Sequence, residues 1–171
     1  MLQKKICMLG SFAVGKTSLV ARFVKSIYSD NYHTTIGVKI DKKQVLVNGE
    51  AVNCILWDIA GEDEFYTINN SYLRGMARFI LVIDGTRSAT LEVACNIYHR
   101  IKDEMGEFPF VVAINKSDLQ DEWEINSQGV AELRDAGATI IHTSAKNGEG
   151  VEEAFQQLVM DMVNFNGKRN G

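Results

Sequence analysis

The chain has 171 residues, a length that fits one domain able to bury a substantial core. Its 18 basic and 22 acidic residues give a net charge of -4. Because no long basic run is present, we exclude nucleic-acid binding through a charged face. The 46% of hydrophobic and 23% of charged residues are typical of an ordinary globular protein, so disordered and fibrous classes are also excluded.

The cysteines and the end of the chain give expectations about its environment. The three cysteines lie far apart without the spacing of a zinc site or a redox motif, so we expect reduced, buried thiols in a cytoplasmic protein. No apolar run approaches the roughly 18 residues of a membrane span. Residues 164–171 contain no cysteine, and we therefore expect no prenylation site and no lipid anchor.

Short β-branched and apolar runs alternate with helical periods along the chain. This pattern predicts an α/β fold with a six-stranded, mostly parallel sheet. The expected strands cover residues 5–9, 38–47, 51–58, 78–84, 108–115 and 139–143. Asn48-Gly49 predicts a type I′ hairpin between the second and third strands, so one edge pair is expected to be antiparallel.

About five helices are expected to flank the sheet, at residues 16–25, 65–74, 90–105, 127–136 and 151–165. The third has an apolar stripe that includes Tyr98, which we interpret as a core residue rather than a functional aromatic. The last has the clearest helical period, formed by Val151, Ala154, Phe155, Leu158, Val159, Met162 and Val163.

Residues 10–17 read GSFAVGKT and fit the phosphate-binding pattern GxxxxGK[ST]. The glycines let the backbone wrap around a phosphate, Lys16 can reach the β and γ phosphates, and Thr17 can offer its hydroxyl to Mg²⁺. The alternative is a glycine-rich turn with an incidental lysine, which the placement between a strand and a helix disfavours. We expect the nucleotide phosphates to be bound by Gly10, Ser11, Phe12, Ala13, Val14, Gly15, Lys16, Thr17 and Ser18.

The base is expected at the carboxyl ends of two later strands. Asp118 can accept hydrogen bonds from N1–H and the 2-amino group of guanine, whereas adenine would leave its carboxylate unpaired. Residues 115–118 alone could be a polar turn. The loop after the next strand, however, can reach the same base from the other side. The expected base-binding residues are Asn115, Lys116, Asp118, Ser144, Ala145 and Lys146.

Two further segments, TTIG at residues 34–37 and DIAG at residues 58–61, complete five motifs in register. Across nearly the whole chain the pattern resembles the Ras-like small GTPases, closest to the Rab branch. The resemblance implies a P-loop GTPase fold and one guanine-nucleotide-binding domain over residues 1–171. It implies that the Thr35 hydroxyl binds Mg²⁺, that Asp58 holds the metal through water, and that the N–H groups of Thr35 and Gly61 contact the γ-phosphate.

The family implies a molecular switch that binds GTP or GDP with Mg²⁺ and hydrolyses GTP. The residues implied to act in hydrolysis are Lys16, Thr35, Gly61 and Glu62. A protein effector is expected to read the nucleotide state through residues near Thr35 and Gly61.

Three residues depart from the family in ways that bear on hydrolysis. Glu62 stands where the family usually has a glutamine that orients the attacking water, so hydrolysis is expected to be slow. Phe12 stands at a position where the family has a small residue, on the path that a partner's arginine finger would take. Ile59 replaces the usual threonine. For Phe12 and Ile59 the alternative is local packing with no effect on activity.

Further segments look more like the Ras-like proteins of bacteria, namely YLRG at 72–75, VIDGTR at 82–87 and INKSDL at 114–119. Three functions compete: a slow Mg²⁺-dependent GTPase switch, an interaction module that binds GTP without meaningful hydrolysis, and a P-loop kinase. The kinase hypothesis gives no role to residues 115–118. An ionised Glu62 is expected either to turn toward solvent or a cationic neighbour, or to stay beside the γ-phosphate.

Overall fold

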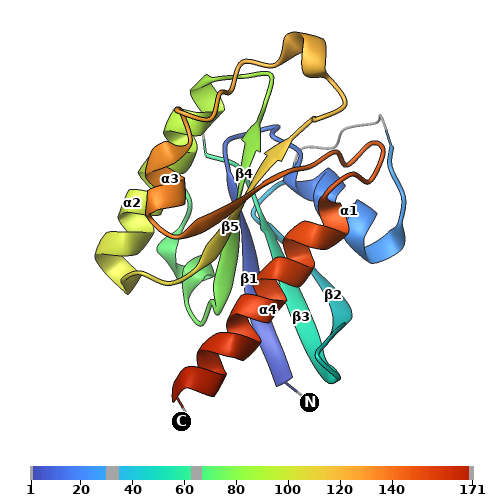
Figure 1. Cartoon of the computed structure of the whole chain (residues 1–171), viewed down its shortest axis with the longest axis vertical. Coiled ribbons are helices and arrows are strands. Elements are labelled where there is room, and N and C mark those ends of the chain that lie inside the picture. Colours follow the sequence, from blue (N-terminus) through green and yellow to red (C-terminus); the bar gives the residue numbers. More distant parts are fainter. Residues whose placement is uncertain (1, 30–34, 63–66, 170–171) are drawn as a thin grey trace.

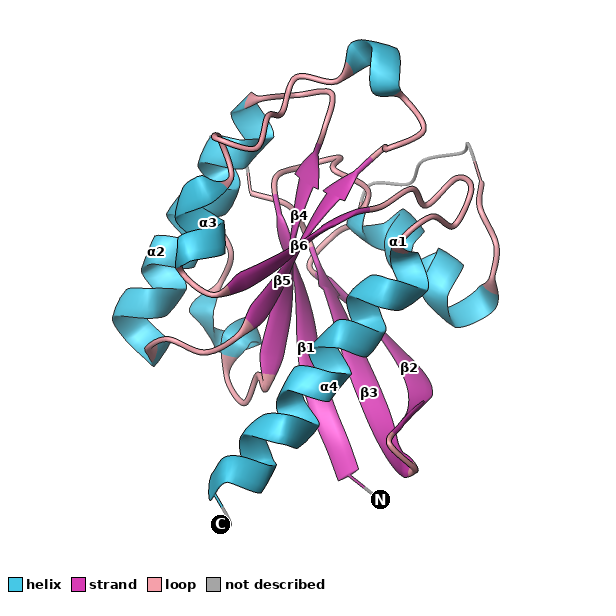
Figure 2. Ribbon diagram, in the orientation of Figure 1, coloured by secondary structure: helices cyan, strands magenta, loops and turns pink. Residues whose placement is uncertain are grey.

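The computed structural model describes residues 2–29, 35–62 and 67–169, with side chains as far as residue 164. Six strands form one sheet in the order β2-β3-β1-β4-β5-β6, with helices on both faces (Figures 1 and 2). Only β2 and β3 pair in antiparallel fashion, as expected. The strands are β1 (Leu2–Gly10), β2 (Val38–Val47), β3 (Glu50–Ile59), β4 (Arg78–Asp84), β5 (Phe110–Asn115) and β6 (Ala138–His142).

The helices of the described residues follow the strands in alternation. The four α-helices in these ranges are α1 (Lys16–Lys25), α2 (Ala89–Met105), α3 (Ala131–Asp135) and α4 (Val151–Arg169). Two short 3₁₀ helices cover Asn70–Leu73 and Gln120–Glu122. The mixed α/β architecture predicted from the alternating pattern is confirmed.

The core lies in two layers because successive side chains of a strand point to opposite faces. In β1, Ile6 and Met8 pack with residues of α1 and α4, while Cys7 and Leu9 pack on the other face with residues of α2 and α3. Tyr98 of α2 is buried and stacks on a phenylalanine of β5, so its assignment to the core is confirmed. The apolar stripe of α4 is buried at Val151, Ala154, Phe155, Leu158, Val159 and Met162.

The predicted hairpin joins β2 and β3. Asn48 and Gly49 have φ angles of 51° and 79°, the positive values that a type I′ turn requires at both central positions. The register then pairs Val47 with Glu50. Ten residues of β2 are thereby placed along the outer edge of the sheet.

One helix prediction was wrong in its described part, and another was correct in place but too long. Residues 65 and 66 lie outside the described residues, and the rest of the expected helix at 65–74 contains only the 3₁₀ turn. The Asn69 side chain accepts a hydrogen bond from the Ser71 N–H and starts this tight turn instead. The helix expected at 127–136 is limited to α3, because the Asn126 side chain binds the Gly129 N–H and holds the preceding residues in turns.

Cys7 and Cys54 are buried and Cys95 is half-buried, all as free thiols. None of the helices in the described part of the chain combines the length and hydropathy needed to span a bilayer.

Candidate functional site

The predicted site residues meet at the carboxyl edge of the sheet. The loops after β1, β5 and β6 lie side by side there, because neighbouring parallel strands end on the same side (Figure 2). The loop after β1 leads directly into α1. We call residues 10–17 the phosphate loop and residues 115–118 the base loop.

The phosphate loop and the base loop are held together by one side chain. The Asn115 amide donates a 3.0 Å hydrogen bond to the Val14 carbonyl oxygen. Gly15, at the start of α1, has a φ of 104°, and a Cβ there would lie 2.2 Å from the Asn115 amide nitrogen. Residues other than glycine are therefore excluded at position 15, because the φ angle is positive and no space remains for a Cβ atom.

Lys16 is buried beneath the phosphate loop. Its ammonium group donates to the carbonyl oxygens of Ser11 at 2.9 Å and of Gly10 at 3.5 Å. Burial lowers the pKa of Lys16 to about 8, and the nearby Asp58 carboxylate opposes that shift. A phosphate at the loop would give this cation the negative partner that carbonyl oxygens supply only in part.

Three oxygen-bearing side chains from different segments meet beside Lys16. The Thr17 hydroxyl lies 2.6 Å from the Thr35 hydroxyl and donates to Asp58 Oδ2 at 2.7 Å. Asp58 Oδ1 is buried and has no hydrogen-bond partner among the described residues. Burial raises the pKa of Asp58, while the Thr17 hydrogen bond lowers it. A hard cation such as Mg²⁺ prefers such oxygen ligands, so these residues fit the expected metal.

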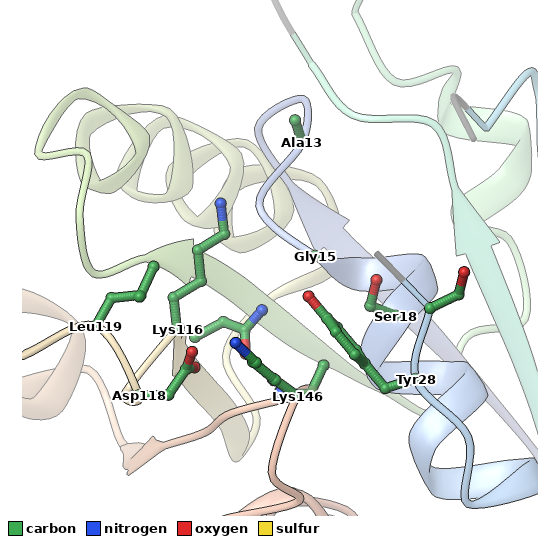
Figure 3. Close-up of a pocket in the computed structure, with 11 residues that line it drawn as sticks. Ala13, Gly15, Ser18, Tyr28, Lys116, Asp118, Leu119 and Lys146 are labelled. Carbon is green, nitrogen blue, oxygen red and sulfur yellow. Dashed lines mark hydrogen bonds between the residues drawn. The ribbon is translucent and has the colours of Figure 1, made fainter. Parts of the chain in front are cut away.

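A cavity of about 310 Å³ lies between the phosphate loop and the loops after β5 and β6. Figure 3 shows Asp118, Lys146 and Tyr28 around it, each from a different segment of the chain. Three lining residues were not expected at the site from the sequence, namely Tyr28, Ser29 and Leu119. The lining is completed by Ala13, Gly15, Ser18, Asn115, Lys116, Ala145 and Lys146, all expected from the sequence.

The base loop is ordered by contacts to the loop after β6. Ser144 donates to Asp118 Oδ1 at 2.7 Å, and Asp118 lines the cavity. Asn115 Oδ1 accepts from the Thr143 hydroxyl at 3.2 Å and from the Ala145 N–H at 3.4 Å. These contacts bring together the residues that the sequence assigned to the base.

A fully buried carboxylate, Asp84, ties the base loop to the phosphate loop. Its Oδ2 lies 2.7 Å from Lys116 Nζ and 2.9 Å from Arg87 Nε. Arg87 also donates to the Phe12 carbonyl oxygen at 2.9 Å. Burial acts to raise the pKa of Asp84, but the hydrogen bonds from Lys116, Thr86 and Arg87 together lower it. Asp84 and Arg87 belong to the VIDGTR segment but were not among the site residues expected from the sequence.

Gly61 and Glu62 lie against the phosphate loop. A Cβ on Gly61 would be 2.5 Å from the Phe12 backbone, so only glycine permits this approach. The Glu62 N–H donates to the Gly10 carbonyl oxygen at 3.0 Å, and the Phe12 N–H donates to the Glu62 carbonyl oxygen at 3.1 Å. This isolated bridge pairs Ser11 with Glu62 beyond the end of β3.

The Glu62 carboxylate points to helix α2. Its Oε1 pairs with the Arg100 guanidinium and accepts a 3.0 Å hydrogen bond from the Ile68 N–H. Of the two orientations considered for an ionised Glu62, the structure has the one toward a cationic neighbour. Arg100 was not identified from the sequence.

A second, very small cavity of about 10 Å³ lies at the phosphate loop, where the terminal phosphates are expected from the sequence, and we call it the terminal-phosphate cavity. Glu62 does not line it. Thr34, the first residue of the TTIG segment, lies outside the described residues. The lining consists of expected residues, namely Phe12, Ala13, Val14, Gly15, Lys16, Thr17, Thr35 and Gly61.

Comparisons with known proteins agree with this geometry. The family model described as Ras family matches residues 5–164. Ras-related protein Rab-31 of Mus musculus is 34% identical over 170 residues, covering 98% of this chain and 87% of the relative. Ras-related protein SEC4 of Saccharomyces cerevisiae is 33% identical over 166 residues, covering 95% and 77%. The chain therefore belongs to the Ras family and is a small GTPase related to the Rab proteins.

Proposed function

We propose that the chain is a slow, Mg²⁺-dependent GTPase that acts as a molecular switch through one guanine-nucleotide-binding domain. The observation that carries this proposal is the meeting of Thr17, Thr35 and Asp58 beside the buried Lys16. Thr17 and Thr35 would hold Mg²⁺ directly, and Asp58 would hold it through water. The metal would neutralise charge on the β and γ phosphates.

Separate sets of residues would bind the base and the phosphates of the nucleotide. Asp118, fixed by Ser144, would accept hydrogen bonds from guanine, and Lys16 would bind the β and γ phosphates. The N–H groups of Thr35 and Gly61 would contact the γ-phosphate, so its presence would order both segments. Ile36, which is 90% exposed beside Thr35, supplies an apolar side chain that an effector protein would contact.

Slow hydrolysis is supported by the orientation of Glu62. A carboxylate that is paired with Arg100 is withdrawn from the cavity and does not orient an attacking water there. The same observation favours the second candidate, an interaction module that binds GTP without meaningful hydrolysis.

One experiment separates the two candidates. The protein is loaded with GTP, excess nucleotide is removed, and loss of GTP is followed in a single turnover with saturating Mg²⁺ and with a chelator. A slow loss that requires Mg²⁺ supports the GTPase. Binding of both nucleotides without such a loss supports the module, and failure to bind either would refute both.

A further inference from the structure

The pair formed by Glu62 and Arg100 joins the segment beside the γ-phosphate position to helix α2. Thirty-eight residues separate the two side chains in the sequence. They are 12% and 28% exposed, respectively, so the contact is largely shielded from water. The Ile68 N–H donates to the same carboxylate oxygen, which gives Glu62 two partners on this side.

The main chain of Glu62 is held separately from its side chain. Hydrogen bonds with Gly10 and Phe12 fix the backbone on the phosphate loop. Removal of Arg100 would therefore leave the backbone in place and release mainly the carboxylate. Because Gly61 lines the terminal-phosphate cavity, the released carboxylate of the next residue would lie close to the γ-phosphate.

The charges around Glu62 define the two alternatives for its side chain. Arg100 faces it from α2, and Lys16 lies within electrostatic range on the phosphate-loop side. Lys16 is needed by the phosphates, so a carboxylate drawn toward it would compete with them. A carboxylate near GTP would also be repelled by the added charge of the γ-phosphate, which GDP lacks.

We propose that Arg100 is a positioning residue that holds the Glu62 carboxylate outside the terminal-phosphate cavity and thereby preserves the affinity for GTP relative to GDP. Arg100 touches neither nucleotide nor metal in this role and acts only through Glu62. The inference rests on the proposed function, since it concerns the same nucleotide site.

The test compares dissociation constants for Mg·GDP and for Mg²⁺ with a slowly hydrolysed GTP analogue. Arg100→Met should weaken binding of the GTP analogue relative to GDP by about three- to tenfold, the size expected for one added charge near the phosphate. Arg100→Lys should retain most of the wild-type ratio. Lys102→Met is the matched control, because it removes the same charge from the exposed face of α2, where Lys102 pairs with Glu107.

Glu62→Gln and the double variant Glu62→Gln/Arg100→Met complete the cycle. In the Glu62→Gln background, Arg100→Met should leave the ratio unchanged, because no carboxylate remains to be released. An equal loss in both backgrounds would mean that Arg100 acts through its own field, and the proposal would be wrong. Equal weakening of both nucleotides would indicate a structural role and would also refute it.

Folding of each variant is checked by circular dichroism, and Arg100→Gln replaces Arg100→Met if the latter does not fold. An unchanged nucleotide ratio in a folded Arg100 variant overturns this inference and leaves the GTPase assignment intact. Failure of the wild-type protein to bind guanine nucleotides would refute the proposed function itself.

Discussion

The Ser144 hydroxyl donates a hydrogen bond of 2.7 Å to Oδ1 of Asp118, across the opening between the loops after β6 and β5. The bond fixes the carboxylate at the wall of the larger cavity. Because the orientation of Asp118 is set before a base binds, its carboxylate can accept a donor pair from guanine at little entropic cost.

Asp118→Asn should exchange guanine specificity for xanthine specificity. The amide offers a donor to the 2-oxo group of xanthine but opposes the N1–H and 2-amino donors of guanine. We expect GTP binding to weaken by about 2–4 kcal/mol and binding of xanthosine triphosphate to improve. Affinities for both nucleotides are measured by calorimetry, with the exposed Asp121→Asn as control. An unchanged preference for guanine would refute the assignment of Asp118.

Lys16→Ala and Thr17→Ala should each weaken Mg·GDP binding strongly, by about tenfold or more, without unfolding the chain. The first removes the buried cation that we propose to bind the phosphates, and the second removes the hydroxyl that contacts Asp58 and that we propose as a magnesium ligand. Calorimetry with Mg·GDP measures both effects. Lys25→Ala, on the exposed end of α1, is the control for loss of a lysine from the same helix. Wild-type affinity in both variants would mean that this loop is not the phosphate site.

Much of the site could be predicted because its parts are local in sequence. The phosphate loop and the base loop each lie within a few residues between a strand and a helix or turn, so their chemistry is visible in a motif. Tyr28 follows α1 without any motif, and only the tertiary fold brings it to the cavity. Arg100 is a surface-type residue on an amphipathic helix, and only tertiary packing brings it to Glu62.

The fold shows the same division. The alternation of strands and helices, the hairpin and the apolar stripe of α4 follow from periodicity and turn chemistry, whose effects are local. The helix expected at 65–74 failed because a single side chain, Asn69, captures a backbone N–H and favours a tight turn over a helix. Hydrophobic periodicity gives no information on whether a side chain will compete with the helix for a backbone N–H.

Asp84→Asn should lower the free energy of unfolding at pH 7 by about 1–2 kcal/mol. The buried carboxylate accepts from Lys116 and Arg87, but these partners are partly exposed, and water would solvate them after the change. Urea denaturation of the nucleotide-free protein measures the difference. Asp103→Asn, at an exposed position of α2, should have little effect.

The pH dependence of that difference follows from the lowered pKa of Asp84. A carboxyl group with a lower pKa in the folded than in the unfolded state adds stability above its unfolded pKa of about 3.9, and that stability is lost as the pH falls through the folded pKa. The gap between wild type and Asp84→Asn should be constant from pH 7 to about pH 5 and should narrow below about pH 4. A gap that widens on acidification would contradict the stabilising role of the carboxylate.

Phe12→Gly should make hydrolysis sensitive to an activating protein that inserts an arginine. Phe12 lines the terminal-phosphate cavity and is 40% exposed, so its side chain should block the approach of a guanidinium supplied in trans. Single-turnover rates with and without a finger-type activator are compared for both proteins, and Phe12→Leu serves as a bulky control. Equal acceleration of the wild type and Phe12→Gly would show that the steric argument is wrong.

Glu62→Gln should increase intrinsic single-turnover hydrolysis by roughly tenfold, the worth of one additional hydrogen bond in the transition state. The wild-type carboxylate is held by Arg100 and the Ile68 N–H, and as an anion it only accepts hydrogen bonds. A neutral amide loses the ion pair, can turn toward the cavity, and can both accept from water and donate to the γ-phosphate. The wild-type rate at neutral pH is expected to be no faster than roughly 10⁻⁴ per second.

The same comparison tests whether Glu62 itself acts in hydrolysis. With its carboxylate held on α2 by Arg100 and the Ile68 N–H, the wild type should be the slower of the two proteins. If the wild type hydrolyses GTP rapidly and Glu62→Gln loses that activity, Glu62 positions the water itself, and its pairing with Arg100 does not describe the reactive state.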